Sequence, residues 1–446
     1  ILKIIFIKNI DNTHFLYACF TENNSSFLYN VHMEKWFAVL DLKSFYASVE
    51  CAKRGLDPFK APLVVCDETR GPGSLVLSVT PYLKTKGCKN IMRKFELPTD
   101  IPLIYAKPNM EEYVRKSTEF NALILEYFAP EDWHPYSIDE TFIYLTPYLN
   151  LYKKTPYELT KFIMDEILNR LNLYATAGVG PNMFLAKVAM DTDAKVAPNR
   201  IAIWTKEDIQ NRLWKITPIT KIWGINKGYE RRLASLGLHT MGDVAQYPKA
   251  LLKEKFGIIG EQIHDHANGI DDSLISETYE PKNPSFTSGQ VFHEDYEKHE
   301  VPMMIREMCD EICYRLRASN FVCNTLSLTA VETKPSNKLH SKSMKLQFPT
   351  NDNDILYETF IEIFSRFNIS APIRQLHLSA SNLSNIRFIQ LTLFEDNEKI
   401  SKNEALYKAI DEIKNKYGSD KIFRADARRE KSTYLERIGQ IGGHRK

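Results

Sequence analysis

Between residues 34 and 200, short apolar runs alternate with segments that have a helical pattern. Residues 36–40 are all apolar and end at Asp41, which is typical of a buried strand. Residues 44–54 then have the spacing of a helix. The same reading predicts strands over 62–66, 74–80, 136–145 and 174–180, and helices over 81–86, 109–128 and 156–173. Strands that alternate with helices predict an α/β core, whose sheet need not be parallel.

The pattern changes near residue 201. Residues 206–270 read as short helices broken by glycines, whereas strand-like runs return after residue 285. We expect strands over 285–292, 323–333, 343–348 and 375–381, and helices over 299–318 and 352–367. This succession predicts a separate small α+β domain, and the chain after 395 reads as helical and basic.

Residues 1–32 show no clear period, and Met33 directly precedes the first clean strand pattern. We expect these residues to be a non-native or disordered extension that lies upstream of the natural start. A chain that begins at Met33 should therefore keep full activity.

Composition narrows the classes of function. The 446 residues predict two to four domains. The net charge is only +2, so a nucleic-acid binder of this composition must concentrate its positive charge locally. The seven cysteines are scattered without a CxxC pair, which indicates reduced thiols and a cytoplasmic location. No uninterrupted apolar run is long enough to span a membrane.

The candidate chemistry lies at two predicted strands. Asp41 ends the first strand, and Asp139 and Glu140 are adjacent within 136–145. If the strands are neighbours, three carboxylates converge, and their repulsion is costly without a cation. Divalent ions such as Mg²⁺ take oxygen ligands, and a pair of them clamps both oxygens of an in-line displacement. The alternative is two unrelated acidic spots, and strand alternation sends Asp139 and Glu140 to opposite faces, which makes one a partial ligand.

Three segments resemble, in order and spacing, the motifs of Y-family (translesion) DNA polymerases, with most similarity to the UmuC-like branch of Gram-positive bacteria. They are FAVLDLKSFYASVE at 37–50, SIDE at 137–140 and AGVGPNMFLAKVA at 177–189. The resemblance covers residues 34–446 and implies an α+β multidomain, right-hand polymerase. It assigns 33–52 and 107–200 to an α/β palm, 53–106 to small fingers, 201–275 to a helical thumb, 276–285 to a linker, 286–385 to an α+β little finger, and 386–446 to a clamp-binding motif and basic tail.

The resemblance also implies site residues. Asp41, Asp139, Glu140 and the main-chain carbonyl of Leu42 would hold two Mg²⁺ ions, for which Mn²⁺ is a substitute. Tyr46 matches the steric gate that excludes a ribose 2′-hydroxyl. The nucleotide site is completed by Phe45, Ser78, Tyr82, Lys84 and Lys195.

Two of these assignments stay open. Which of Pro81, Tyr82 and Lys84 contacts the triphosphate is undecided, because the motif departs from the usual order there. Lys195 lies one residue further from Lys187 than in many relatives. A solvated surface lysine is the alternative for both Lys84 and Lys195.

A segment near residue 224 resembles a helix-hairpin-helix, with Gly224, Ile225, Asn226, Lys227 and Arg231 as DNA contacts. Asn226 replaces the second glycine and is expected to take the left-handed conformation. Backbone N–H groups in such a hairpin point at phosphates. A plain helix-turn-helix packing corner is the alternative.

A pentapeptide after the last predicted strand resembles the bacterial sliding-clamp motif. Its contacts would be Gln390, Leu391, Leu393 and Phe394, and an ordinary core strand is the alternative reading. The partners implied are primer-template DNA, dNTP, the β clamp and an accessory SOS protein, with no membrane. We expect a monomer, and the basic tail has no assigned role beyond DNA or partner contact.

The implied function is template-directed, error-prone translesion DNA synthesis without proofreading. A metal-dependent DNA nuclease and a non-catalytic clamp- and DNA-binding adaptor are the alternatives. Tyr46 and the triphosphate lysines discriminate against a nuclease, which needs neither. The set of three carboxylates argues against an adaptor.

Overall fold

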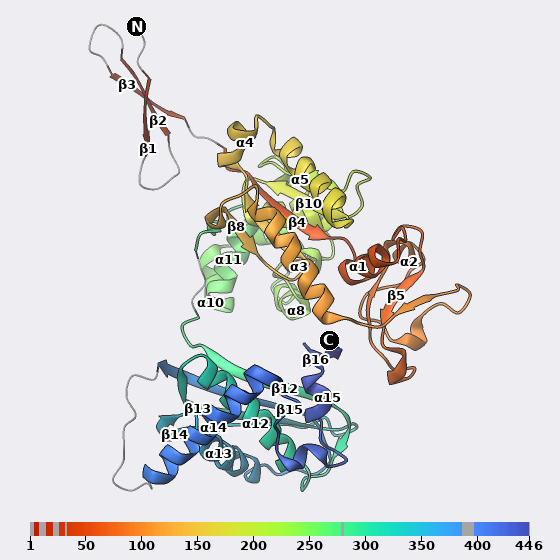
Figure 1. Cartoon of the computed structure of the whole chain (residues 1–446). Helices are drawn as coiled ribbons and strands as arrows, with labels where there is room; N and C mark the ends of the chain where they lie inside the picture. Colours follow the sequence, from red (N-terminus) through yellow and green to blue (C-terminus); the bar gives the residue numbers. More distant parts are fainter. Residues whose placement is uncertain are drawn as a thin grey trace. The chain divides into compact units, whose positions relative to one another are not determined.

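The computed structural model describes residues 4–8, 15–20, 26–31, 34–277, 281–385 and 397–445 (Figure 1). The chain divides into two compact units, an N-terminal unit of residues 1–278 and a C-terminal unit of residues 279–446. The predicted linker at 276–285 contains this division.

The N-terminal segment forms three antiparallel strands in the order β1 (Ile4–Lys8), β2 (Phe15–Phe20) and β3 (Ser26–Val31). The pattern predicted no strands here, and the prediction that residues 1–32 are an extension upstream of the natural start stays a prediction. The sequences FLYACF and SFLYNV are rich in aromatic residues, which favour strands even without a clear alternation.

A five-stranded mixed sheet is the core of the N-terminal unit. Its order is β11 (Ile201–Ile203), β10 (Ala175–Gly180), β4 (Phe37–Leu42), β9 (Glu140–Tyr144) and β8 (Trp133–Pro135). β4 is antiparallel to both of its neighbours, and β10 is parallel to β11. Because β4 is central, residues 37–40 are buried, as their continuous apolar run predicted.

Five helices accompany the strands of this sheet along the chain. They are α1 (Phe45–Lys53), α3 (Met110–Leu125), α4 (Thr146–Tyr152), α5 (Pro156–Leu171) and α6 (Met183–Ala189). Both α5 and α6 contact β10. Asn109 and Thr155 start α3 and α5 by accepting hydrogen bonds from the N–H groups of Glu112 and Glu158.

A smaller three-stranded sheet lies between α1 and α3 in the sequence. Its order is β6 (Val76–Val79), β5 (Leu63–Cys66) and β7 (Ile104–Ala106), and α2 (Pro81–Thr85) follows β6. Its buried core is separate and small, and it contains Val64, Val76 and Leu83.

The segment after residue 206 is helical, as predicted. Its helices are α7 (Asp208–Asn211), α8 (Lys227–Ala234), α9 (Met241–Gln246), α10 (Lys249–Phe256) and α11 (Ile258–Ala267). Buried residues of this segment, such as Leu213 and Ile222, share one hydrophobic cluster with Phe37 and Phe142 of the central sheet. The helical segment and the sheet are therefore parts of one packed body.

The C-terminal unit contains a four-stranded antiparallel sheet in the order β12 (Ser285–Tyr296), β15 (Ile373–Asn385), β13 (Phe321–Glu332) and β14 (Leu339–Thr350). Helices α12 (Val301–Ala318) and α13 (Asn353–Ser365) bury its inner side chains in one core. Beyond the sheet come α14 (Asn397–Tyr417), α15 (Tyr434–Ile438) and the short strands β16 (Gln440–Ile441) and β17 (His444–Arg445).

The basic tail of this unit is folded onto α12. Lys431 pairs with Glu300 at 2.8 Å, and Arg437 pairs with Glu311. The hydroxyl of Tyr296 donates to the carbonyl of Lys431 at 2.6 Å. Several of the tail's cations are thus neutralised by acidic residues of the same unit.

Candidate active site

Asp41 and Glu140 are direct cross-strand partners in the central sheet. Asp41 is the penultimate residue of β4, and it lies opposite Glu140, the first residue of β9. Side chains of such a pair project from the same face of a sheet. The structure therefore brings together the two acidic positions that the sequence placed about a hundred residues apart.

The prediction that Asp139 lies within the strand is wrong, because β9 begins one residue later. Residues 136–139 turn sharply, since the N–H groups of Tyr136 and Ser137 both donate to the carbonyl of Glu140, at 2.9 and 3.1 Å. The Ser137 hydroxyl donates to the Asp139 carboxylate at 2.8 Å. Leu42 N–H donates to the carbonyl of Asp139 at 2.8 Å. Asp139 therefore stays beside β4, and strand alternation does not set its direction.

A tight turn connects Asp41 to Tyr46. Ser44 has φ 50° and ψ 48°, the left-handed region that is unfavourable for a residue with a side chain. Its carbonyl accepts the N–H of Ser48 at 2.9 Å, so α1 starts immediately after the strand. The Ser44 hydroxyl is buried without a hydrogen-bond partner. Strain of this kind persists only where the surrounding structure enforces it.

Helix α6 lies very close to β10 because of a glycine. A Cβ atom on Gly178 would come within 2.0 Å of the Ala186 carbonyl oxygen, so no larger residue fits. This packing brings Lys187 to the acids. Its ammonium lies 2.7 Å from Glu140 Oε1 and 3.2 Å from Asp191, and the lysine side chain is only 7% exposed.

A π-helical turn follows α6 at Met190–Ala194. A π turn contains one more residue than an α turn between bonded groups, and such turns often occur at functional sites. It lies between Lys187 and Lys195 and sets their spacing. Lys195 pairs with Asp191 at 2.6 Å, so Asp191 joins the two lysines.

The acids and lysines of the site lie close enough to shift one another's pKa values. Burial raises the pKa of Asp41 to about 6, Lys195 opposes this shift, and Asp139 and Glu140 add to it. Burial also raises the pKa of Glu140, and the hydrogen bond and charge of Lys187 partly offset the rise. Ionised acids are therefore costly here until more positive charge is supplied.

The donor set suits a hard divalent cation, although the carboxylates are not gathered as metal ligands. Within the described part of the chain, no three His, Cys, Asp or Glu side chains are placed to hold one ion. The predicted convergence is incomplete because Lys187 attracts the Glu140 carboxylate. Yet Glu140 Oε1 is buried without a hydrogen bond of good geometry, despite that ion pair. An under-satisfied carboxylate oxygen opposite Asp41 fits an oxygen-seeking cation.

The candidate nucleotide-binding residues form two groups, those beside the acids and those that belong to the packing of the fold. Lys84 is close enough to Asp41 and Asp139 to act on them electrostatically, although burial is the main cause that lowers its pKa. Tyr46 stacks on Tyr113 with ring centroids 4.5 Å apart, and its pKa is raised by burial and then by Asp139. These positions agree with a pocket beside the acids.

The remaining nucleotide candidates are parts of the packing. Phe45 and Leu42 are buried, and Ser78 is buried in β6 opposite Val65. Tyr82 packs against the core of the smaller sheet, and its N–H donates to the Pro58 carbonyl at 3.3 Å. Of Tyr82 and Lys84, only the lysine acts on the acidic residues.

In the helix-hairpin-helix candidate, Gly224 has φ 87°, whereas Asn226 is extended with φ −92°. The expectation of a left-handed Asn226 is therefore wrong. Its side chain instead caps α8 by accepting the N–H groups of Gly228 and Tyr229, at 2.8 and 3.0 Å. Ile225 is buried, whereas Lys227 and Arg231 are exposed around this turn.

Sequence reasoning missed the roles of Lys187 and Asp191. The available signal was a lone lysine inside the apolar run of 183–190, where a buried charge needs a partner. The clamp-binding candidates Gln390, Leu391, Leu393 and Phe394 lie outside the described residues.

Comparisons with known proteins identify the family and the fold. The model of the impB/mucB/samB family matches residues 40–191, and that of the family's C-terminal domain matches residues 283–393. A protein named putative UV-damage repair protein UvrX, from Bacillus subtilis (strain 168), is 36% identical over 422 residues, which cover 94% of this chain and 99% of the relative. DNA polymerase IV 2 of the same organism is 33% identical over 421 residues, which cover 93% and 99% of the two chains.

Among solved structures, a Y-family DNA polymerase chimera of Dbh and Dpo4 aligns with a TM-score of 0.63 at 20% identity. The alignment covers 78% of this chain and 98% of that one. At this identity the likeness shows the shared fold.

The family matches and the shared fold together define a template-directed nucleotidyltransferase. The chain belongs to the impB/mucB/samB family, the Y-family DNA polymerases of the UmuC/DinB type. It is a DNA-directed DNA polymerase of the translesion kind, and this family depends on divalent metal ions. It acts on primer-template DNA and dNTP. Neither the nuclease nor the adaptor alternative is favoured.

Among the described helices, none has the length and apolar character needed to cross a membrane.

Proposed function

We propose that Asp41, Asp139, Glu140 and the Leu42 carbonyl hold two Mg²⁺ ions during nucleotidyl transfer, with Mn²⁺ as a substitute. The observation that carries this proposal is the cross-strand pairing of Asp41 with Glu140. The bound ions would neutralise charge and orient the oxygens of the displacement. The raised pKa of Asp41 supports a site that is completed only by added positive charge.

The cationic side chains act on the triphosphate in this proposal. Lys84 and Lys195 supply positive charge near Asp41 and orient the nucleotide phosphates. Lys187 keeps Glu140 ionised, since it is the group within 2.7 Å of that carboxylate. Lys187 therefore acts as a positioning residue rather than by contacting the substrate.

Tyr46 is the proposed sugar discriminator. Its ring is half-buried and fixed by stacking on Tyr113, which supports a rigid wall beneath the sugar. We expect Tyr46→Ala to admit ribonucleotides, measured as the ratio of rNTP to dNTP incorporation. The variant Tyr46→Phe keeps the ring and is the matched control. Unaltered sugar selectivity in Tyr46→Ala would remove this role.

The domain assignment follows the same proposal. The mixed sheet with α3, α5 and α6 acts as the palm, the smaller sheet as the fingers, the helices after 206 as the thumb, and the C-terminal sheet with α12 and α13 as the little finger. Lys227 and Arg231 then contact DNA phosphates, with Gly224 allowing close approach.

Clamp binding through residues 390–394 is proposed from the sequence alone. Leu391, Leu393 and Phe394 would fill an apolar groove, and Gln390 would bond at its edge. Pulldown of the β clamp with Leu393→Ala and Phe394→Ala tests this, and unchanged capture contradicts it. The accessory SOS partner is tested in the same assay by adding lysate from damaged cells.

The decisive experiment is primer extension by the purified protein on intact and abasic templates. We expect extension with dNTP and Mg²⁺ on both templates, and Mn²⁺ should replace Mg²⁺. Shortening of the primer without extension would favour the nuclease. Binding of DNA without either reaction would favour the adaptor.

A further inference from the structure

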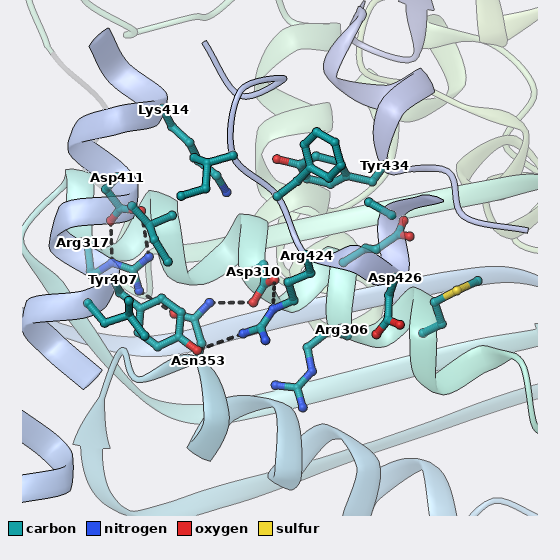
Figure 2. A pocket seen from close by; sticks show the side chains of 17 residues that line it. Arg306, Asp310, Arg317, Asn353, Tyr407, Asp411, Lys414, Arg424, Asp426 and Tyr434 are labelled. Carbon is teal, nitrogen blue, oxygen red and sulfur yellow. Dashed lines mark hydrogen bonds and ion pairs between the residues drawn. The ribbon is translucent and has the colours of Figure 1, made fainter. Parts of the chain in front are cut away.

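A cavity of about 180 Å³ lies inside the C-terminal unit, and none of the residues assigned to catalysis lines it (Figure 2). Its walls come from α12, from α14 and from the tail that follows α14. The apolar part of the lining consists of Met303, Leu406, Ile410, Ile422, Phe423 and Ala427. Cavities of roughly 150 Å³ with apolar walls bind a molecule as large as benzene.

Two ion pairs line one side of the cavity, and within each pair the two charges neutralise each other. Arg317 pairs with Asp411 at 2.6 Å, and Arg424 pairs with Asp310 at 2.8 Å. Asn353 connects them, since it donates to Asp310 and accepts from Arg317, both at 2.6 Å. These contacts are drawn as dashed lines in Figure 2. This wall is therefore fixed and carries no excess charge.

Lys414 is the cation of the cavity lining that has an aromatic contact in place of an ion pair among the described residues. Its side chain extends from α14 into the space, as Figure 2 shows. Among the described residues, none forms a hydrogen bond or ion pair with its ammonium, and the Tyr434 ring centroid is 5.8 Å away. Burial lowers the pKa of Lys414, while Asp310 and Asp411 oppose this effect from a distance.

Other charged groups of the lining are already engaged. Glu307 accepts hydrogen bonds from Ser432 at 2.5 Å and Thr433 at 3.2 Å. Arg306 pairs with Asp354 at 3.1 Å and stacks on a tyrosine ring outside the lining. Asp426 pairs with Arg429 at 3.0 Å. Lys414 is thus the charged group of the lining that can offer a ligand a direct ion pair, and a half-buried ammonium held only by a ring and by carboxylates at a distance is costly.

We propose that this cavity binds a small organic carboxylate with a flat apolar body, whose carboxylate pairs with Lys414. The apolar walls accept a ring of benzene size, and Tyr434 and Phe423 offer aromatic faces. The ligand's carboxylate supplies the direct ion pair that the ammonium lacks. A bound ligand also joins α14 to the tail, because both line the cavity.

Isothermal titration of the full chain with benzoate tests the proposal. We expect saturable binding of benzoate, and affinity at least roughly tenfold weaker for neutral benzamide, because one charge-assisted contact is lost. Lys414→Met should weaken benzoate binding by a similar factor. Lys416→Met is the matched control, since that lysine is exposed and lies outside the lining, and it should bind benzoate normally.

A second variant separates loss of the site from loss of the fold. Ala427→Leu fills part of the cavity and should weaken benzoate and benzamide alike. Circular dichroism and hydrogen exchange of β13 establish that each variant is folded. The proposal is overturned if benzoate does not bind the intact protein at millimolar concentration, if benzamide binds as tightly, or if folded Lys414→Met binds benzoate unchanged.

Discussion

Two buried glutamates, one in each unit, have pKa values that are shifted in opposite directions. Glu140 of the N-terminal unit has a pKa raised by burial, and one of its oxygens lacks a well-placed hydrogen bond. Glu332 of the C-terminal unit is fully buried, yet its pKa is lowered to about 2. Burial is the largest cause of the pKa shift at Glu140, whereas hydrogen bonds from Ser336 and Ser370 outweigh burial at Glu332.

Glu332 is surrounded by donors from three parts of its unit. The Ser336 hydroxyl donates to it, and so do the N–H and hydroxyl of Ser370, at 2.7 Å and 3.1 Å from Oε1. His340 Nε2 lies 3.0 Å from the same oxygen. The carboxylate thereby joins the β13–β14 hairpin to the residues before β15. A fully satisfied acid stabilises a fold, whereas an under-satisfied acid is poised to take a cation.

The largest expected effect is loss of catalysis from the N-terminal unit. Asp41→Asn keeps the shape of the side chain and removes its charge. We expect primer extension to fall by at least roughly 10³-fold, because several kcal/mol of transition-state stabilisation through the metals is lost. DNA binding, measured by fluorescence anisotropy, should persist.

The control for that variant is Asp193→Asn, a nearby acid that pairs with Arg212 at 2.7 Å. It should keep most of the extension activity, because its charge is not directed at the metal site. Asp41→Asn with normal extension would remove Asp41 from the ligand set.

The next effect is on stability in the C-terminal unit. Glu332→Gln keeps the size of the side chain but loses charge-assisted hydrogen bonds, and we expect a loss of about 2–4 kcal/mol. Hydrogen exchange of β13 measures this change. The five tryptophans all lie at or before residue 223, so their fluorescence reports the N-terminal unit and should be unaffected.

Glu436→Gln is the matched control, because that acid is half exposed and we expect a change within about 0.5 kcal/mol. Equal effects of the two substitutions would mean that the network around Glu332 contributes nothing special.

The unfolding free energies of the two units should change with pH in opposite directions. The folded state holds the Asp41 proton more tightly, since its pKa of about 6 exceeds the ordinary 3.8. Without metal, the unfolding free energy of the N-terminal unit should fall as pH rises from about 4 to 6, by at most about 3 kcal/mol. The lowered pKa of Glu332 means that its contribution is present above the ordinary 4.5 and is lost as pH falls toward 2.

Urea unfolding followed by tryptophan fluorescence measures the first slope, and Asp41→Asn should flatten it. Hydrogen exchange of β13 across the acidic range follows the second, and Glu332→Gln should flatten that one. Parallel slopes in the two units would contradict the contrast between their acids.

Sequence alone predicted the central strand and most of the helices, and it placed Asp41 and Glu140 on strands that the structure shows to be neighbours. These features depend on local apolar runs and on motifs of fixed spacing. The predicted strand at 136–145 was too long, because the turn before Glu140 depends on two backbone N–H groups that share one carbonyl. The pattern also missed β8 and β11, short edge strands that form only when longer neighbours are present.

The partner of Glu140 could not be predicted for a related reason. Lys187 reaches the acid because Gly178 lets α6 approach β10, a contact that joins segments distant in sequence. Likewise Asn226 was expected to be left-handed, but its side chain accepts hydrogen bonds from two N–H groups at the start of α8. In both cases a tertiary or capping contact overrode the preference of the single residue.

The smallest prediction concerns backbone strain, which also differs between the units. Within the described residues, the left-handed non-glycine positions of the C-terminal unit are asparagines, whereas those of the N-terminal unit include Ser44 beside the acids. Asparagine tolerates this conformation better than serine.

Ser44→Gly should stabilise the N-terminal unit by about 0.5–1 kcal/mol, because relief of strain and removal of an unpaired buried hydroxyl exceed the entropy cost of glycine. Asn337→Gly, at φ 48°, is the control and should gain less. Urea unfolding by tryptophan fluorescence measures Ser44→Gly, and hydrogen exchange of β13 and β14 measures Asn337→Gly. A loss of stability in Ser44→Gly would show that the turn between Asp41 and Tyr46 is held without strain, and the contrast between the units would then rest on their carboxylates alone.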